Sequence, residues 1–243
     1  MSFGSVKLVH NDGKMHHLGI DESVVAKKVI LTPNPQQIPF YASFLDHAEK
    51  VGEYREYVTY TGTYKGVPMS VMSCGFGCMP MAIAVEELNH LGVEEIIKIA
   101  ACPALQPEIK AGSLLAGSAA VRSEGATREY IDISYPAVSD MALLSRLLKA
   151  GAEDAALFRS HDCLSLDTPW SFGGKERMQY WQGLGVSVVD GETSAMFVIA
   201  AILKMRAASL ALISENYANG EKADVTDSNL EKLFRTAAEA LCG

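Results

Sequence analysis

Charged residues at the junctions between predicted strands and helices suggest chemistry in this sequence. Asp190-Gly191-Glu192 lies between an apolar strand and an apolar helix. A carboxylate at such a junction can accept hydrogen bonds from the hydroxyls of a ligand, such as a sugar diol. The alternative is structural, because Asp and Glu are also favoured at the N-cap and in the first turn of a helix. Both interpretations stay open at this point.

A glycine turn and a buried lysine suggest a place for an anion. Gly75-x-Gly77 separates a predicted strand from a helix over 79–91. Backbone N–H groups and the helix dipole can face a phosphate at such a turn, although glycines are common between strands and helices. Lys98 stands inside the apolar run 96–101. Its ammonium therefore either reaches solvent from a sheet edge or serves a ligand.

Composition and motif content argue against several function classes. The 243 residues carry a net charge of −8, which argues against a nucleic-acid binder that works by neutralising phosphates. The five cysteines show no zinc-like pairing, so we expect reduced thiols and no metal in a cytoplasmic protein. The sequence shows no signal peptide, no apolar run long enough for a membrane span and no complete dinucleotide fingerprint. We therefore expect neither a cofactor nor a membrane partner.

The predicted elements place the candidate residues at one edge of a sheet. Strands alternate with helices and no linker interrupts them, so we expect a single domain over residues 1–243. The expected fold class is α/β, a three-layer α/β/α sandwich around a mostly parallel mixed sheet. A right-handed strand–helix–strand unit brings Gly75-Gly77 and residues 100–103 to the carboxyl edge, where open α/β sheets bind ligands. Strands are predicted at 29–32, 54–63, 67–73, 96–101, 113–121, 155–163, 185–190 and 208–214, and helices at 38–51, 79–91, 138–150, 175–183, 192–205 and 228–241.

Taken together, these segments resemble the hexameric nucleoside phosphorylase family, most closely its bacterial-type uridine phosphorylase branch. The resemblance covers roughly residues 16–240, and its segments occur in the family's order. It is carried by the glycine turn and by His17-Leu18-Gly19-Ile20, Ile83-Ala84-Val85-Glu86-Glu87-Leu88, Leu91-Gly92, Ala104-Leu105-Gln106-Pro107, Gly112, Ala120-Val121-Arg122, Gly125-Ala126, Tyr135-Pro136-Ala137-Val138, Gly174-Lys175-Glu176-Arg177 and Asp190-Gly191-Glu192. It implies a nucleoside substrate and phosphate as co-substrate. Phosphate would attack C1′ of the ribose as an oxocarbenium-like sugar forms and the base leaves.

The resemblance also implies a role for each candidate site residue. Two residues would come from a neighbouring subunit, so the protein would be at least a dimer, and the family is usually hexameric. By position, Glu192 and Gly191 would adjoin the ribose, and His17 of a neighbouring subunit would contact its 5′-hydroxyl. The phosphate would be bound by Gly75, Gly77 and Lys98 together with Arg55 of a neighbouring subunit, and the base would face Lys175, Arg177 and Tyr217. The candidates for a catalytic carboxylate are Glu192 and Glu215.

The phosphate segments depart from the family pattern. The first phosphate loop, Gly-Asp-Pro-x-Arg, reads Pro-Asn-Pro-Gln-Gln at residues 33–37. The second phosphate arginine is Lys98, which keeps the charge but loses the bidentate fork. The strand end Gly-Thr-Thr-Gly reads Ala-Ala-Cys-Pro at residues 100–103.

Three hypotheses therefore remain. The first is a uridine-type phosphorylase that uses phosphate. The second is a nucleoside hydrolase, in which water replaces phosphate and Glu192 or Glu215 is the general base. The third is a catalytically silent nucleoside-binding protein of the same fold, or a partner subunit in a hetero-oligomer with an intact paralogue.

Overall fold

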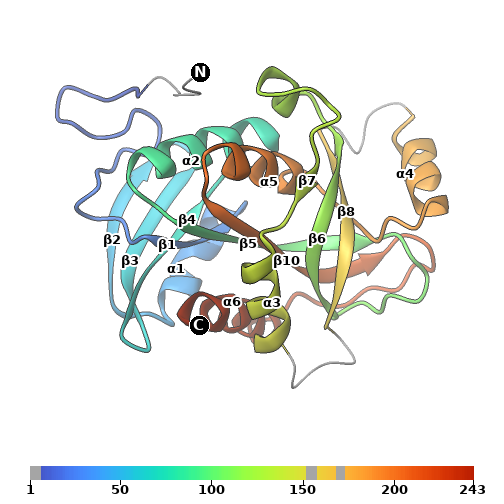
Figure 1. The fold of residues 1–243 in the computed structure, drawn as a ribbon. Coiled ribbons are helices and arrows are strands. Elements are labelled where there is room, and N and C mark those ends of the chain that lie inside the picture. The colour runs from blue at the N-terminus through green and yellow to red at the C-terminus, as the bar shows by residue number, and fades with distance from the viewer. Residues whose placement is uncertain (1–6, 152–157, 168–172) are drawn as a thin grey trace.

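One mixed sheet forms the middle of the molecule in the computed structural model, which describes residues 7–151, 158–167 and 173–243 (Figure 1). The strand order is β10-β6-β8-β9-β5-β1-β4-β3-β2, and β7 pairs with β6. Because β5 pairs with β10 as well as with β9, that end of the sheet closes on itself. The strands are β1 (Lys28–Thr32), β2 (Asp46–Tyr54), β3 (Tyr57–Tyr64), β4 (Val67–Ser73), β5 (Glu95–Ala104), β6 (Leu114–Ser123), β7 (Ala137–Val138), β8 (Phe158–Leu166), β9 (Val188–Asp190) and β10 (Arg206–Asn216).

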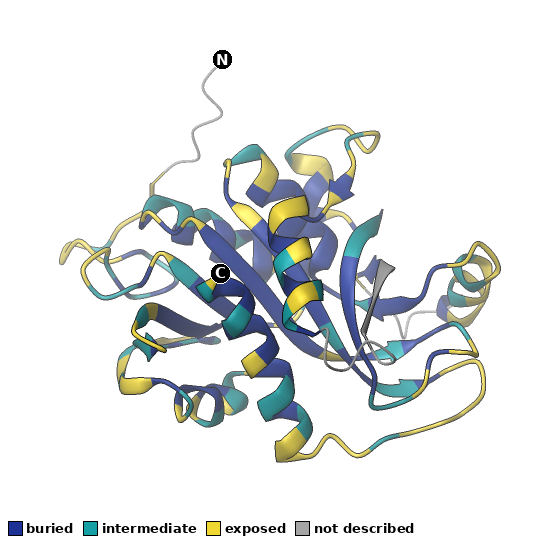
Figure 2. Ribbon diagram, turned by 60° about the horizontal axis from the view of Figure 1, so that its bottom comes forward, coloured by how far each residue is buried: buried dark blue, intermediate teal, exposed yellow. Residues whose placement is uncertain are grey.

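Helices cover both faces of this sheet, which confirms the expected α/β class. Helices α2 and α5 lie on one face, and α1, α3 and α6 lie on the other (Figure 1). Two apolar cores fill the spaces between the layers, and Figure 2 shows that the exposed residues gather on the outward sides of the helices. The helices are α1 (Ile38–Ala42), α2 (Cys78–His90), α3 (Met141–Ala150), α4 (Gly174–Gly183), α5 (Thr193–Ile202) and α6 (Asp227–Cys242), with short 3₁₀ turns at Pro35–Gln37 and Ala126–Glu129.

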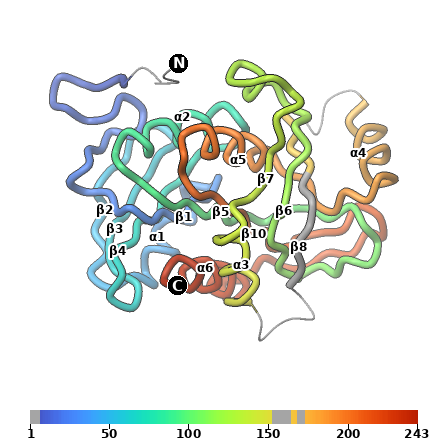
Figure 3. The backbone as a smooth tube through the Cα atoms, viewed as in Figure 1, coloured from blue at the N-terminus to red at the C-terminus, as the bar shows by residue number. Residues whose placement is uncertain are grey.

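The strand directions place the carboxyl ends of several strands at one edge of the sheet, as predicted. β1 lies between β4 and β5 and runs parallel to both, so the strand–helix–strand unit β4-α2-β5 spans one intervening strand. β10 is also parallel to β5 over a long register. Figure 3 follows the chain from β4 into α2 and from β9 into α5, two helices that pack against each other. Gly77 and Cys78 donate hydrogen bonds to Glu192 and Gly191, so the starts of the two helices lie next to each other.

The predicted helix over 38–51 is wrong beyond its first turns. α1 ends at Ala42, and the chain continues as β2, which pairs antiparallel with β3. His47, at the start of β2, has a φ of 53°, which is incompatible with a continuing right-handed helix. Pairing with β3 outweighed the local apolar periodicity, because a neighbouring strand satisfies the backbone groups of this segment.

Within the described part of the chain, no helix combines the length and the apolar character needed to cross a membrane.

Candidate functional site

A cleft of about 390 Å³ opens at the carboxyl edge of the sheet. The ends of β1, β5, β9 and β10 and the turn before α2 form its walls, as expected for a binding site of this fold class. Its volume suits a small ligand. Its described lining residues are Thr32, Pro33, Asn34, Gln37, Phe76, Ala100, Ala101, Cys102, Pro103, Val189, Asp190, Gly191, Glu192, Ser214, Glu215 and Tyr217.

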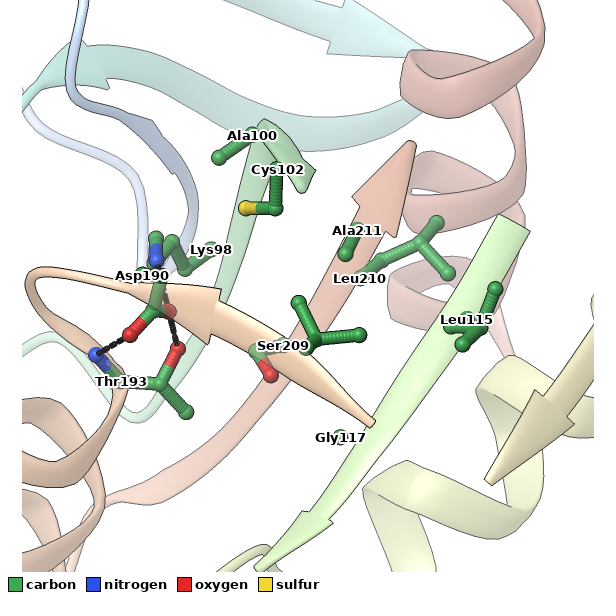
Figure 4. Close-up of a pocket in the computed structure, with 11 residues that line it drawn as sticks. Lys98, Ala100, Cys102, Leu115, Gly117, Asp190, Thr193, Ser209, Leu210 and Ala211 are labelled. Atoms are coloured by element: carbon green, nitrogen blue, oxygen red, sulfur yellow. Dashed lines mark hydrogen bonds and ion pairs between the residues drawn. The ribbon is translucent and has the colours of Figure 1, made fainter. Parts of the chain in front are cut away.

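Lys98 lies beside this cleft and is buried between two carboxylates. Its side chain is only 2% exposed, and β5 is an interior strand, so the interpretation that Lys98 reaches solvent from a sheet edge is wrong. Lys98 Nζ pairs with Asp190 Oδ2 and lies 2.8 Å from Glu192 Oε2. A third bond, of 3.2 Å, runs to Thr193 Oγ1. One ammonium thus serves two acids, and Figure 4 shows it pointing at Asp190.

Asp190 is fixed in place by several donors besides Lys98. Ser165 Oγ donates to Asp190 Oδ1 at 2.9 Å, and Thr193 bonds it through both its hydroxyl and its backbone N–H (Figure 4). Burial favours the neutral acid, but Lys98 and the hydroxyls of Thr193 and Ser165 outweigh it and hold the pKa of Asp190 below its ordinary value. Asp190 is therefore an ionised, anchored counter-ion, and it also accepts the backbone N–H of Thr193 at the start of α5.

Glu192 joins the lysine to the start of α2. Its Oε1 accepts a hydrogen bond of 2.9 Å from the backbone N–H of Gly77, while Oε2 faces Lys98. Gly77, the N-cap of α2, has a φ of 100°, and Gly75 has a φ of 69°. Gly75 has no room for a side chain, because an added Cβ would lie 2.8 Å from Pro80. The glycine turn thus aims an N–H group at an anion, which here is the carboxylate of Glu192.

The walls of the cleft carry negative charge. Among its described lining residues, the charged side chains are Asp190, Glu192 and Glu215, all carboxylates. The substituted loop after β1 contributes the neutral groups of Asn34 and Gln37. Asn34 accepts a hydrogen bond from the backbone N–H of Gln36, so it serves partly as a local cap. A phosphate here needs cations from beneath the cleft or from outside this chain.

A buried thiol also lines the cleft. Cys102, on β5, stands where the family pattern has a threonine, and burial raises its pKa to about 12. It therefore stays protonated at neutral pH and is a poor nucleophile.

Of the three predicted base-binding residues, one lines the cleft and two do not. Tyr217 lines the cleft beside Glu215, at the end of β10. Lys175 and Arg177 lie in the exposed first turn of α4, and neither belongs to the described lining of the cleft. Gln182, further along α4, donates to the backbone carbonyl of Leu105 at 2.6 Å, which ties this helix to the end of β5.

His17 and Arg55 lie away from the cleft of their own chain. Arg55 is exposed at the turn between β2 and β3, where its φ is 53°. His17 Nδ1 lies 2.6 Å from Glu87 Oε1, and the same carboxylate accepts the backbone N–H groups of His17 and Leu18. Arg55 is therefore exposed and His17 is half-buried, and their donation to a neighbouring subunit stays a prediction.

Sequence analysis left Asp190 open between ligand binding and helix capping, and it missed the pairing of Asp190 with Lys98. The signal was available, because a lysine inside an apolar strand requires a buried counter-charge. The supporting hydroxyls of Ser165 and Thr193 come from β8 and α5, and local sequence carries no signal for their convergence.

One further cluster has the donor types of a metal site. Cys78, Glu124 and Asp167 place one possible ligand atom each within 4.8 Å of one another. Cys78 Sγ donates to the carbonyl of Gly191 at 2.9 Å, and Asp167 accepts the N–H of Gly125 at 2.8 Å. Burial raises the pKa of the Cys78 thiol, which disfavours the thiolate that a metal needs. These groups are bound internally, and we assign no metal to them.

Comparison with known proteins shows which family this chain resembles in sequence and structure. The phosphorylase superfamily model matches residues 27–243. A uridine phosphorylase from Treponema pallidum (strain Nichols) is 31% identical, over 97% of this chain and 96% of that protein. A guanosine phosphorylase from Halorubrum lacusprofundi is 28% identical, over 94% and 95% of the two chains. The crystal structure of uridine phosphorylase from Vibrio fischeri ES114 is similar with a TM-score of 0.85 at 30% identity, covering 96% of this chain and 99% of that one.

Proposed function

This chain belongs to the phosphorylase superfamily, and we propose that it is a nucleoside phosphorylase of the uridine type. Phosphate adds to C1′ of the nucleoside, so that a C1′–O bond forms while the C1′–N bond to the base breaks. The base leaves with the electron pair and takes up a proton, and the sugar leaves as ribose 1-phosphate. Relatives named uridine phosphorylase that match over nearly the whole chain carry this proposal.

The cleft supports the nucleoside half of this proposal. Glu192 presents a buried carboxylate at the junction of β9 and α5, where ribose 2′ and 3′ hydroxyls can donate to it. Gly191, next to Glu192 in the cleft lining, has no side chain that would occupy the space proposed for the ribose. Tyr217 offers an aromatic face for the base, and Lys175 and Arg177 are proposed to approach the carbonyl oxygens of uracil from α4.

The phosphate half depends on two cations. Lys98 supplies one beneath the cleft, together with the N–H groups of the Gly75-Gly77 turn. The charged side chains in the described walls are all carboxylates, so a phosphate requires a second cation from elsewhere. We propose that Arg55 of a neighbouring subunit supplies it, and that His17 of that subunit approaches the 5′-hydroxyl. The working form is therefore at least a dimer, and we expect the hexamer that is usual in the family.

The described cysteines with placed side chains are all free thiols, which fits the reducing cytoplasm in which we place this enzyme. Phosphate is the proposed co-substrate, and the proposal needs no cofactor.

Uracil release from uridine, followed with and without millimolar phosphate, tests this function. We expect release that depends on phosphate and yields one ribose 1-phosphate for each uracil. Release that is equal without phosphate would identify a hydrolase. An absence of release from uridine, inosine and adenosine would favour a catalytically silent binding protein or a partner of an intact paralogue.

A further inference from the structure

The donors that the proposed function assigns to phosphate are already occupied by a side chain of the same chain. Glu192 places one carboxylate oxygen 2.9 Å from the N–H of Gly77 and the other 2.8 Å from Lys98 Nζ. The residue is 1% exposed. A carboxylate that bridges a helix N-terminus and an ammonium makes the charge-assisted bonds that a phosphate would make there.

The two carboxylates around Lys98 are held differently. Asp190 is anchored by Lys98 together with Ser165 and Thr193. Glu192 is held by the N–H of Gly77 and by Lys98, the two donors needed for phosphate. A phosphate placed beside this carboxylate would add a second anion to the same two donors, and like charges at such short range repel strongly away from water. Glu192 and phosphate therefore compete.

We propose that Glu192 is the resident anion of the phosphate site, so that phosphate binds well only after a nucleoside has engaged Glu192. The ribose hydroxyls donate to the carboxylate and draw it away from Gly77 and Lys98. The N–H of Gly77 and the ammonium of Lys98 then donate to phosphate. This inference rests on the proposed function and adds an order of binding to it. By linkage, the nucleoside and phosphate must strengthen each other's binding by the same factor.

Calorimetric titration of inorganic phosphate into the full-length protein tests this order. One titration uses the free protein. A second uses protein saturated with a C-nucleoside of uracil, whose carbon–carbon bond to the base cannot be cleaved by phosphate. A third uses the 2′,3′-dideoxy form of that C-nucleoside. We expect the C-nucleoside to strengthen phosphate binding by about tenfold or more, and the dideoxy form, which has no hydroxyl to offer Glu192, to leave it nearly unchanged.

A pair of variants separates occupancy of the donors from the general charge of the cleft. Glu192→Gln removes the charge that holds Lys98 and Gly77, so the free variant should bind phosphate about tenfold more tightly than the free wild type. Glu215→Gln removes a charge from the same cleft without touching either donor, and its effect should be much smaller. Thermal melts of both variants check that they are folded.

The results that overturn the inference are distinct from those that overturn the function. Equal phosphate affinity with and without the C-nucleoside, in a protein that cleaves uridine with phosphate, removes the inference alone. An equal gain in phosphate affinity for both variants also removes it, because charge in general would then explain the effect. An absence of phosphate binding in every titration, with no phosphate-dependent cleavage of uridine, removes both.

Discussion

At the scale of single residues, the site depends on how one positive charge is shared. Lys98 faces Asp190 and Glu192 where little water enters, so its ammonium replaces the solvation that both carboxylates lost on folding. In the family pattern an arginine at this position would offer a planar fork to phosphate. Lysine offers a point charge, which suits two separate carboxylates.

Replacing this lysine should destabilise the protein. Lys98→Met keeps an unbranched side chain of similar length but leaves two buried carboxylates without their cation. We expect the free energy of unfolding to fall by about 3–5 kcal/mol, because the loss of one partner leaves buried charge uncompensated. Urea unfolding measures the change, and Lys98→Arg, which keeps the charge, is the control. A loss below about 1 kcal/mol in Lys98→Met would contradict the central role of this ion pair.

Asp190 should make the free energy of unfolding depend on pH in the acidic range. Lys98 and the neighbouring hydroxyls hold its pKa low in the folded protein, so its contribution is full above the unfolded value of about 3.9 and is lost as the pH falls toward the folded value. The difference in unfolding free energy between wild type and Asp190→Asn should therefore be largest near pH 7. It should shrink between about pH 4 and pH 3, as measured by urea unfolding at each pH. A difference that stays constant down to pH 3 would show that the pKa of Asp190 is not lowered by folding.

At the scale of elements, the turn between β4 and α2 couples backbone shape to the site. Gly77 has a φ of 100° and donates its N–H to Glu192, whereas Gly66 has a φ of 78° in the turn between β3 and β4, away from the cleft. An added Cβ finds no atom within 4 Å at either glycine. The two positions therefore form a matched pair in which backbone conformation alone opposes alanine.

Gly77→Ala and Gly66→Ala should differ in function and agree in stability. Each should cost about 1–3 kcal/mol of unfolding free energy, because both force alanine into a left-handed or more strained conformation. Only Gly77→Ala reorients an N–H proposed to face phosphate, so only it should raise the KM for phosphate, by about tenfold. Steady-state kinetics with varied phosphate give this comparison. Equal KM values for the two variants would argue against a phosphate contact at Gly77.

The regular elements were predictable because most of them carry a clear local pattern. The helices predicted at 79–91, 175–183 and 228–241 and the hairpin of β3 and β4 lie close to the observed bounds. The failure at 38–51 arose because β2 is polar and gains its stability from pairing with β3, which no local periodicity reports. At the site, the sequence indicated the carboxyl edge and Lys98. The sharing of charge among Lys98, Asp190 and Glu192 depends on β5, β9 and α5 meeting in space.

At the scale of the whole molecule, the acidic walls of the cleft motivate the proposal that sites are shared between subunits. Arg55 stands at an exposed turn outside its own cleft, and the proposed phosphate site needs a second cation. Each complete site would then combine Glu192 of one subunit with Arg55 of its neighbour.

Co-expression of two inactive variants should restore part of the activity. Arg55→Ala and Glu192→Ala each damage every site of their own homo-oligomer. In a mixed pair, one site combines an intact Glu192 with an intact Arg55, so random pairing should restore on the order of a quarter of wild-type activity. Uracil release by the mixture, compared with each variant alone, measures this. Activity no higher than that of the better single variant would show that Arg55 acts within its own chain or not at all.

The identity of the nucleophile tests the account most directly. Uridine is cleaved in water enriched in oxygen-18 with unlabelled phosphate present, and the sugar product is analysed by mass spectrometry. We expect unlabelled ribose 1-phosphate, because the new oxygen at C1′ comes from phosphate. Free ribose released from the start in place of ribose 1-phosphate would mean that water attacks C1′, and it would contradict the proposal that this acidic cleft accepts phosphate.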